Sequence, residues 1–200
     1  MAPTSADGGI PETGALFDRH KERLRRTVRL RLDGRLLGLV DSSGVLKRVR
    51  EEAARRGGEL AGHGGSDPFL WLRQVTGAVL SQLHHERLGA DVRGDISLYR
   101  GALPEATSIS LAAHLLGRGA GDDDKAAARA EQKLLLQEAL NAMEPLDREV
   151  LTLRHCEQLS NDEAATVLGI PRSQASEAYI RALKRITPVL ASLPGFKGKA

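Results

Sequence analysis

The chain has 200 residues, enough for one or two domains with a hydrophobic core in each. Its net charge of +3 is only mildly basic, and its single cysteine, Cys156, excludes an internal disulfide framework. The sequence has no apolar run of membrane-spanning length and no secretory core at its start, so we expect a cytoplasmic protein that does not bind membranes.

The distribution of charge is more informative than the total. Residues 19–56 contain thirteen Lys or Arg against five Asp or Glu, and residues 171–200 contain six against one. Three consecutive aspartates, Asp122-Asp123-Asp124, lie between these basic segments. Two basic segments divided by an acidic spacer predict two separate contacts with a polyanion.

Few aromatic residues, and no run that alternates β-branched with polar residues, predict an all-α chain. In the first half, helices are expected at Leu16–Arg35, with a break near Asp33-Gly34, at Val45–Arg56, and from Pro68 to about Leu88. One face of the first helix is nearly solid arginine from Arg23 to Arg29. That face fits a solvated surface and a contact with nucleic acid or an acidic protein about equally well.

The second half begins with a region rich in Gly, Asp, Ser and Ala, in which only Ile109–Leu116 has a helical pattern. Helices are expected at Ala128–Met143 and Leu146–His155, separated by Pro145. The predicted organisation is a disordered start, a first helical domain, a linker, a second helical domain and a basic tail, at residues 1–13, 14–92, 93–127, 128–188 and 189–200.

The second domain contains the pattern of a helix-turn-helix. Ser160 with Glu163 three residues later fits a capping box, which satisfies free amide donors where a helix begins. Gly169 permits the left-handed geometry that ends a helix. Pro171 prevents continuation and suits the first turn of the next helix. The sequence therefore predicts two short helices joined by a tight turn.

The second of these helices is predicted to bury one stripe, formed by Ala175, Ala178, Tyr179, Ala182, Leu183 and Ile186. The other side is the predicted recognition surface, formed by Arg172, Ser173, Gln174, Ser176, Glu177, Arg181, Lys184 and Arg185. Residues at the start of such a helix reach base edges, where Arg suits guanine and Gln suits adenine. Arg181, Lys184 and Arg185 lie further along, where phosphates are the expected contacts.

These motifs resemble the sigma-70 family of bacterial sigma factors, in its small extracytoplasmic-function group. The resemblance in the second half lies in Glu144–Arg185, with Leu146-Asp147, Leu159-Ser160 and Gly169-Ile170-Pro171, and it matches the part that the family calls region four. In the first half, Arg23–Arg26 with Leu32–Leu36 and the run Phe69-Leu70-Trp71-Leu72 resemble region two. The resemblance covers roughly residues 14–188 and implies two helical domains on a flexible linker.

The family resemblance also implies contacts. Region four would read the −35 promoter element and pack on the polymerase flap, while region two would dock on the polymerase clamp and capture the melted −10 strand. For the −10 contact the implied residues are Trp71, Arg73, Gln74, Gln82 and His85, although spacing favours a core role for Trp71. For docking they are Asp41, Val45, Lys47 and Arg48. The chain departs from the family at Gly44, Lys47, Arg48, Gln82, His85 and Glu86, and at Glu177 and Ala178 in the recognition helix.

The resemblance therefore predicts a non-enzymatic subunit that directs core RNA polymerase to promoter DNA and is a monomer when free. An anti-sigma protein is a further partner that the family allows without identifying it. The alternative is a stand-alone helix-turn-helix regulator that binds a two-fold DNA site as a dimer. A small hydrolase is disfavoured because no set of nucleophile, acid and base converges. We expect no cofactor and no metal, since His84-His85-Glu86 point to different helix faces.

Overall fold

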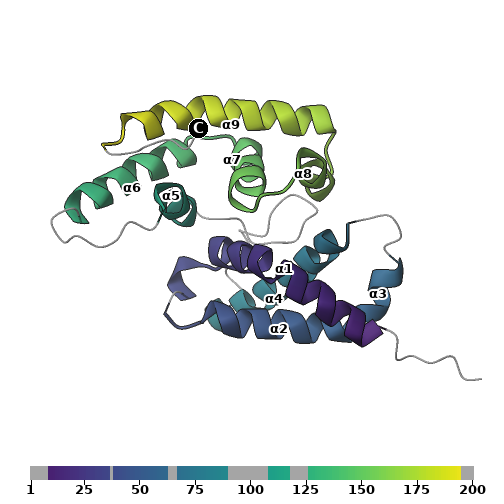
Figure 1. Cartoon of the computed structure of the whole chain (residues 1–200). Helices are drawn as coiled ribbons and strands as arrows, with labels where there is room; N and C mark the ends of the chain where they lie inside the picture. The colour runs from purple at the N-terminus through teal and green to yellow at the C-terminus, as the bar shows by residue number, and fades with distance from the viewer. Residues whose placement is uncertain (1–8, 37, 63–66, 90–107, 118–125, 195–200) are drawn as a thin grey trace, which may run out of the picture. The chain divides into compact units, whose positions relative to one another are not determined.

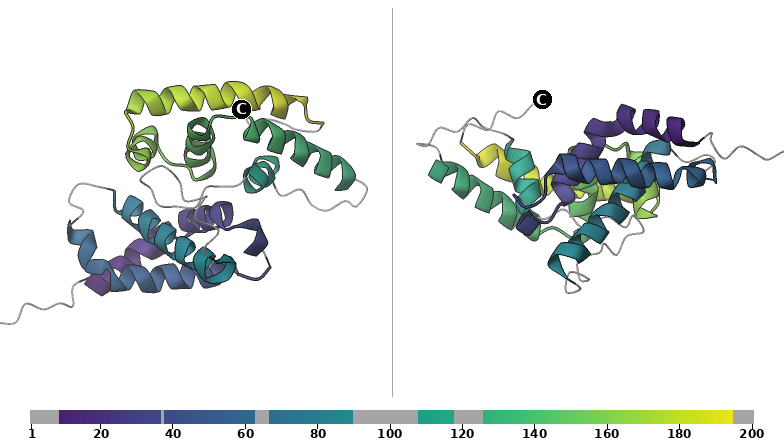
Figure 2. Two further views of the ribbon diagram at one scale, coloured as in Figure 1. Left: turned by 180° about the vertical axis from the view of Figure 1, so that it is seen from behind. Right: turned by 90° about the horizontal axis from the view of Figure 1, so that it is seen from below.

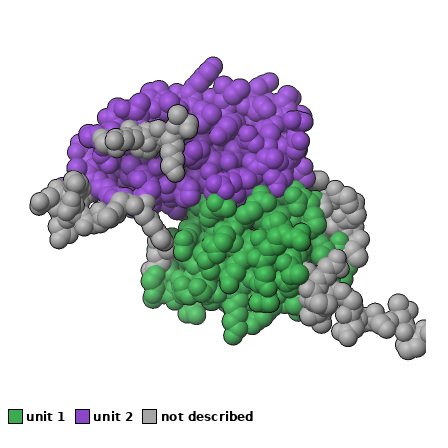
Figure 3. All heavy atoms as spheres, viewed as in Figure 1, with its two compact units in different colours: residues 1–105 green, residues 106–200 purple. Residues whose placement is uncertain are grey.

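The computed structural model describes residues 9–36, 38–62, 67–89, 108–117 and 126–194. The described residues are predominantly helical, which confirms the all-α fold class. The chain divides into two compact units, unit 1 at residues 1–105 and unit 2 at residues 106–200 (Figures 1 and 3). None of the described helices combines the length and the apolar character that crossing a membrane requires.

Unit 1 is built on three helices that pack against one another, α1, α2 and α4 (Figure 2). Its elements are α1 (Gly9–Arg31), η1 (Gly34–Leu36), α2 (Ser42–Arg55), α3 (Gly57–Gly62) and α4 (Pro68–Leu88). Helix α4 begins as predicted, with Pro68 in its first turn and the Asp67 carboxylate accepting from the Phe69 amide at 2.8 Å. Eleven of its 21 residues are buried, so α4 is the central helix of this unit.

The first helix is longer at its start than the sequence predicted. Helix α1 begins at Gly9, inside the segment that was expected to be disordered through residue 13. Thr13 and Phe17, one turn apart, are only 2% and 3% exposed, and their burial explains why the helix extends. The break at Asp33-Gly34 is confirmed, because α1 ends at Arg31 and the short helix η1 follows.

In unit 2, the long helix α9 packs against α6, α7 and α8 (Figures 1 and 2). The elements are α5 (Ser108–Leu116), α6 (Ala126–Asn141), α7 (Pro145–Leu151), η4 (Thr152–Cys156), α8 (Asn161–Leu168) and α9 (Arg172–Ser192). Helix α5 lies within the predicted linker, yet it packs against α6 with Leu111 and Ala112 fully buried. This part of the predicted linker therefore belongs to the core of unit 2.

The predicted regular helix from Leu146 to His155 changes its geometry halfway. After α7, residues Thr152–Cys156 form one π-helical turn, η4, closed by the Glu157 amide donating to the Thr152 carbonyl at 2.9 Å. The Thr152 hydroxyl donates back to the Arg148 carbonyl at 2.8 Å, a bond of the kind that competes with the helix ladder. Gln158, with φ 60°, then turns the chain toward α8.

Candidate nucleic-acid interface

The helix-turn-helix begins at the predicted capping box. The Glu163 amide donates to the Ser160 hydroxyl at 3.1 Å, and the Ser160 amide donates to the Glu163 carboxylate at 2.6 Å. Both bonds are present, so the interpretation of Ser160 as a helix cap is confirmed. The reciprocal cap fixes the residue at which α8 starts, and with it the register of every side chain on α8.

The turn between α8 and α9 follows the predicted glycine. Gly169 has φ 64°, in the left-handed region where a side chain is strained, and the Ile170 amide donates to the Ala165 carbonyl at 3.1 Å. Pro171 occupies the cap position before α9 rather than the first helical turn. The first residue of the second helix is therefore Arg172.

Helix α9 buries a stripe of small residues against its neighbours. Ala175, Ala178, Ala182 and Ile186 are buried as predicted, whereas Tyr179 and Leu183 are half-buried. The Arg154 guanidinium lies 5.1 Å from the centre of the Tyr179 ring, so the ring is partly covered by a cation from η4. Alanines at the contact let α9 lie close to α7 and α8.

The opposite face of α9 is exposed. Its exposed members are the predicted residues Arg172, Ser173, Gln174, Glu177, Arg181, Lys184 and Arg185, and Ser176 is half-buried. Ile180, which the sequence reasoning did not assign to this face, is 51% exposed. The polar face reaches the start of the helix, where a recognition helix meets base edges.

Arg172 is held by the start of α8. Its Nε lies 2.9 Å from Asp162 Oδ1, and its backbone carbonyl accepts from Asn161 Nδ2 at 3.0 Å. The side chains of Arg172 and Asp162 are 74% and 64% exposed, so the ion pair is open to solvent and to a ligand. The sequence reasoning missed both α8 residues, because only the helix-turn-helix geometry brings them to Arg172.

Arg181 is held differently, by a carboxylate of α7. Its Nε and Nη2 donate to the two oxygens of Asp147 at 3.0 and 2.7 Å, and the Asp147 side chain is only 9% exposed. These hydrogen bonds raise the pKa of Arg181 above its ordinary value. In this structure the guanidinium joins α9 to α7, and the phosphate contact expected for Arg181, whose side chain is 52% exposed, stays a prediction.

The predicted −10 residues of unit 1 separate into two groups. Trp71 and Arg73 are 1% and 2% exposed and lie in the core, so a DNA strand cannot reach them in this conformation. The stacking role implied for Trp71 and the contact implied for Arg73 are therefore corrected to core positions. Gln74, Gln82 and His85 are exposed on α4, as a contact would require.

The predicted docking residues of α2 divide in the same way. Val45 is 1% exposed and packs inward, which removes it from a docking surface, whereas Lys47, Arg48 and the cap residue Asp41 are exposed. Both Nη atoms of Arg48 donate to one oxygen of Glu86 at 3.1 Å. Two residues that depart from the family pattern therefore pair with each other across α2 and α4.

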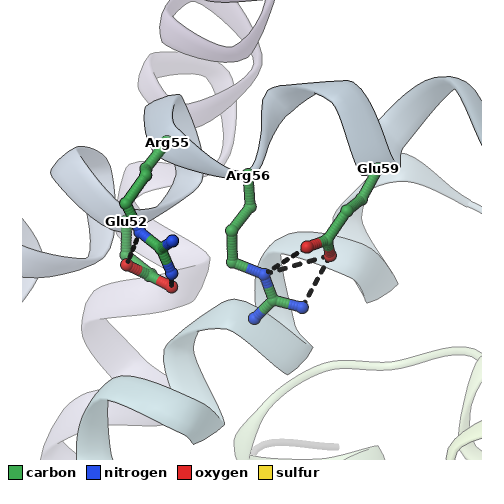
Figure 4. Close-up of polar contacts among 4 residues, drawn as sticks. All are labelled: Glu52, Arg55, Arg56 and Glu59. Atoms are coloured by element: carbon green, nitrogen blue, oxygen red, sulfur yellow. Dashed lines mark hydrogen bonds and ion pairs between the residues drawn. The ribbon is translucent and has the colours of Figure 1, made fainter.

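A shallow cleft of about 210 Å³ lies beside this pair, lined by Arg48, Glu51, Glu52, Arg55, Val79 and Gln82. Within the lining, Arg55 Nε donates to Glu52 at 2.9 Å, and at the end of α2 the neighbouring Arg56 Nη2 donates to Glu59 at 2.6 Å (Figure 4). The bond from Arg55 holds the pKa of Glu52 below its ordinary value. Both arginines that line the cleft, Arg48 and Arg55, are therefore paired with a glutamate.

The arginine face of α1 makes many contacts inside unit 1. The Arg23 guanidinium lies 3.6 Å from the centre of the Phe69 ring, and Arg31 is 1% exposed. Arg25 pairs with Glu22, one turn away, and Arg29 is exposed. Part of the arginine face therefore packs inside unit 1, and Arg29 remains exposed.

His84 is a buried histidine of α4 that faces the end of α1. It is 5% exposed, and its Nε2 accepts from the Asp33 amide at 3.2 Å. Burial lowers the pKa of His84, and nearby Arg35 adds to this while Asp33 opposes it. His84 therefore acts as a neutral hydrogen-bond acceptor that joins α4 to the turn after α1.

The capped first helix, the left-handed glycine and the exposed polar face of α9 define unit 2 as a DNA-binding helix-turn-helix domain. Residues 133–186 match the family model described as sigma-70, region 4. The chain therefore contains a segment that is similar to region 4 of the sigma-70 family. The matched span runs from α6 through most of α9.

The other comparisons add little to this assignment. No curated protein matches the sequence. A solved structure described as CnrH in complex with the cytosolic domain of CnrY is 19% identical, covers 94% of this chain and 92% of its own, and has a TM-score of 0.49. A likeness of that strength carries no argument about function.

Proposed function

We propose that the chain is a sigma factor of the extracytoplasmic-function group, which directs core RNA polymerase to specific promoters. The region 4 match over residues 133–186 carries the proposal, because it coincides with a capped helix-turn-helix whose second helix has an exposed polar face. The chain supplies recognition and no catalytic step of its own. Its partners are core polymerase and promoter DNA, with an anti-sigma protein as a further candidate.

In unit 2, the proposed −35 contact divides along α9. The exposed first-turn residues Arg172, Ser173 and Gln174 read base edges in the major groove. Lys184 and Arg185, exposed three turns later, contact phosphates and supply the affinity that does not depend on sequence. Arg181 maintains the angle of α9 on α7 through its bonds to Asp147.

In unit 1, we assign the proposed contacts to those predicted residues that are exposed. Gln74, Gln82 and His85 on α4 contact the −10 strand, and Lys47 and Arg48 on α2 face the polymerase clamp, with Asp41 beside them. Two weak contacts on one chain give strong binding, because the second contact becomes intramolecular.

The test is a pull-down of bacterial core RNA polymerase by the purified full chain, with a known sigma factor as competitor. We expect competable binding that Lys47→Glu weakens about tenfold or more, since the substitution reverses a charge on the docking helix. Lys21→Glu is the matched control, because Lys21 is exposed on another helix of the same unit. It should bind core polymerase like the unaltered protein.

The contrary outcome is a folded protein that does not bind core polymerase at moderate salt. That result would reject the proposal and favour a stand-alone regulator, which should elute as a stable dimer in gel filtration. A monomer that binds core polymerase excludes the regulator.

A further inference from the structure

Two consecutive residues at the start of α8 hold the first residue of α9. Asn161 Nδ2 donates to the backbone carbonyl of Arg172 at 3.0 Å, and Asp162 Oδ1 lies 2.9 Å from the Nε of the Arg172 side chain. The first contact fixes where the α9 backbone begins, and the second restrains the guanidinium. The Ser160 capping box in turn fixes the residue preceding both.

We propose that Asp162 is a positioning residue that aims the Arg172 guanidinium at a guanine of the −35 element. The inference rests on the proposed function, since it requires α9 to read DNA. Arginine reads guanine with two N–H groups directed at O6 and N7. The contact with Asp162 is to Nε, which leaves the two Nη groups to make that bidentate contact.

The arrangement also reduces the entropic cost of recognition. The Arg172 side chain is 74% exposed, and without a partner it would sample many rotamers that must be frozen on binding. Immobilising one such side chain costs a factor of about two to ten in affinity. Because Asp162 already restrains the side chain in the free protein, less of that cost falls on the complex with the correct base pair.

The second arginine–aspartate pair of α9 shows what a purely structural pair looks like. Asp147 engages both Nε and Nη2 of Arg181 and is 9% exposed, so two donors of that guanidinium are committed to a carboxylate with little access to solvent. Asp162 is 64% exposed and contacts Arg172 through Nε. The difference in exposure and in occupied donors separates a pair that aims an arginine from a pair that holds a helix.

An aspartate beside DNA also repels phosphates, and this gives the proposal a distinctive signature. Asp162→Asn removes a negative charge, so affinity for random DNA should rise about twofold to threefold. At the same time, discrimination between the preferred base pair at the position that Arg172 contacts and its replacement should fall about twofold to tenfold. A merely structural role for Asp162 would lower both quantities together.

The experiment uses the full chain bound to core polymerase. Selection from a random duplex library identifies the preferred −35 sequence, and competition binding then compares that site with a copy in which one guanine is replaced. The variants are Asp162→Asn, Arg172→Ala and the double substitution. Glu144→Gln is the charge-matched control, because Glu144 is exposed at the start of α7 and makes no side-chain capping bond there.

We expect Arg172→Ala to abolish discrimination at one guanine. Asp162→Asn should reduce discrimination at the same guanine. The double variant should lose no more discrimination than Arg172→Ala alone. Glu144→Gln should leave discrimination unchanged, and Asp162→Glu should restore part of it. Unchanged discrimination in Asp162→Asn, with a clear preferred site in the unaltered protein, would overturn this inference alone. If the unaltered protein with core polymerase selects no sequence, the proposed function and the inference fail together.

Discussion

The two units show how far a residue's place in a motif determines what it can contact. In unit 2, the residues predicted to bind DNA lie on the open side of α9, a helix whose packed stripe is mostly alanine. In unit 1, Trp71, Arg73 and Val45 occupy the expected positions in the chain but are buried. A helix covered along one stripe exposes its other residues, whereas a central helix such as α4 has only a narrow open face.

The largest effect is expected from truncating the core helix of unit 1. Trp71→Ala should lower the free energy of unfolding of this unit by about 3–5 kcal/mol, because it removes a buried aromatic side chain and leaves a cavity. Hydrogen exchange of the α4 amides measures the change in unit 1 separately from unit 2.

The comparison for Trp71→Ala is Gln82→Ala on the exposed face of the same helix. It should change the stability by no more than about 0.5 kcal/mol, since Gln82 lies at the surface. If Trp71→Ala kept the original protection of α4 but failed to open promoter DNA, Trp71 would be a base-stacking residue and its burial would be irrelevant to its role.

The helices and the turn chemistry were largely predictable from the sequence. Pro68, Ser160 with Glu163, and Gly169 each act through local backbone chemistry, and each has the predicted local role. The π-helical turn at Thr152 was not predictable, because a threonine in a helical pattern is compatible with both helix types. Local signals determine where helices begin and end, and they say less about internal irregularities.

The candidate site was less predictable, because its decisive contacts join distant elements. The expected outward residues of α9 include both Arg172 and Arg181, and periodicity cannot distinguish between them. Their partners, Asp162 and Asp147, become visible only once α7, α8 and α9 are packed. Likewise, the departures Arg48 and Glu86 looked unrelated in the sequence, yet they form an ion pair.

The second largest effect is expected on the stability of unit 2, where Arg181 should differ from its exposed neighbours on α9. Arg181→Ala leaves the carboxylate of Asp147, 9% exposed, without its bidentate partner. An unpartnered carboxylate with so little access to water destabilises the fold, so the melting temperature of unit 2 should fall by roughly 5 °C or more. Lys184→Ala, at an exposed position, should change it by about 1 °C or less and instead flatten the salt dependence of DNA binding.

Calorimetry and salt titration of the two variants together test this division of roles. An Arg181→Ala protein with unchanged melting temperature and a flatter salt dependence would return Arg181 to the phosphate-contacting group. The Asp147 pair would then be incidental to the stability of unit 2.

The smallest effect concerns acid and the buried His84. Because burial lowers its pKa in the folded protein, the unfolded chain binds a proton more readily than the folded chain as pH falls below about 6.5. Stability is therefore fully present above that pH and declines below it, until the lowered pKa of the folded state is reached. Protonation would also remove the Nε2 lone pair that accepts from the Asp33 amide.

The control for this pH dependence is His84→Gln, whose amide oxygen can accept the same hydrogen bond but does not titrate. Denaturation of unit 1 between pH 7 and pH 5 should show a smaller loss of stability in this variant than in the unaltered protein. Arg35 holds the pKa of Asp33 below its ordinary value, so the Asp33 carboxylate contributes its own loss only below about pH 4. Equal slopes for both proteins between pH 7 and pH 5 would show that folding does not lower the pKa of His84, which would contradict this prediction.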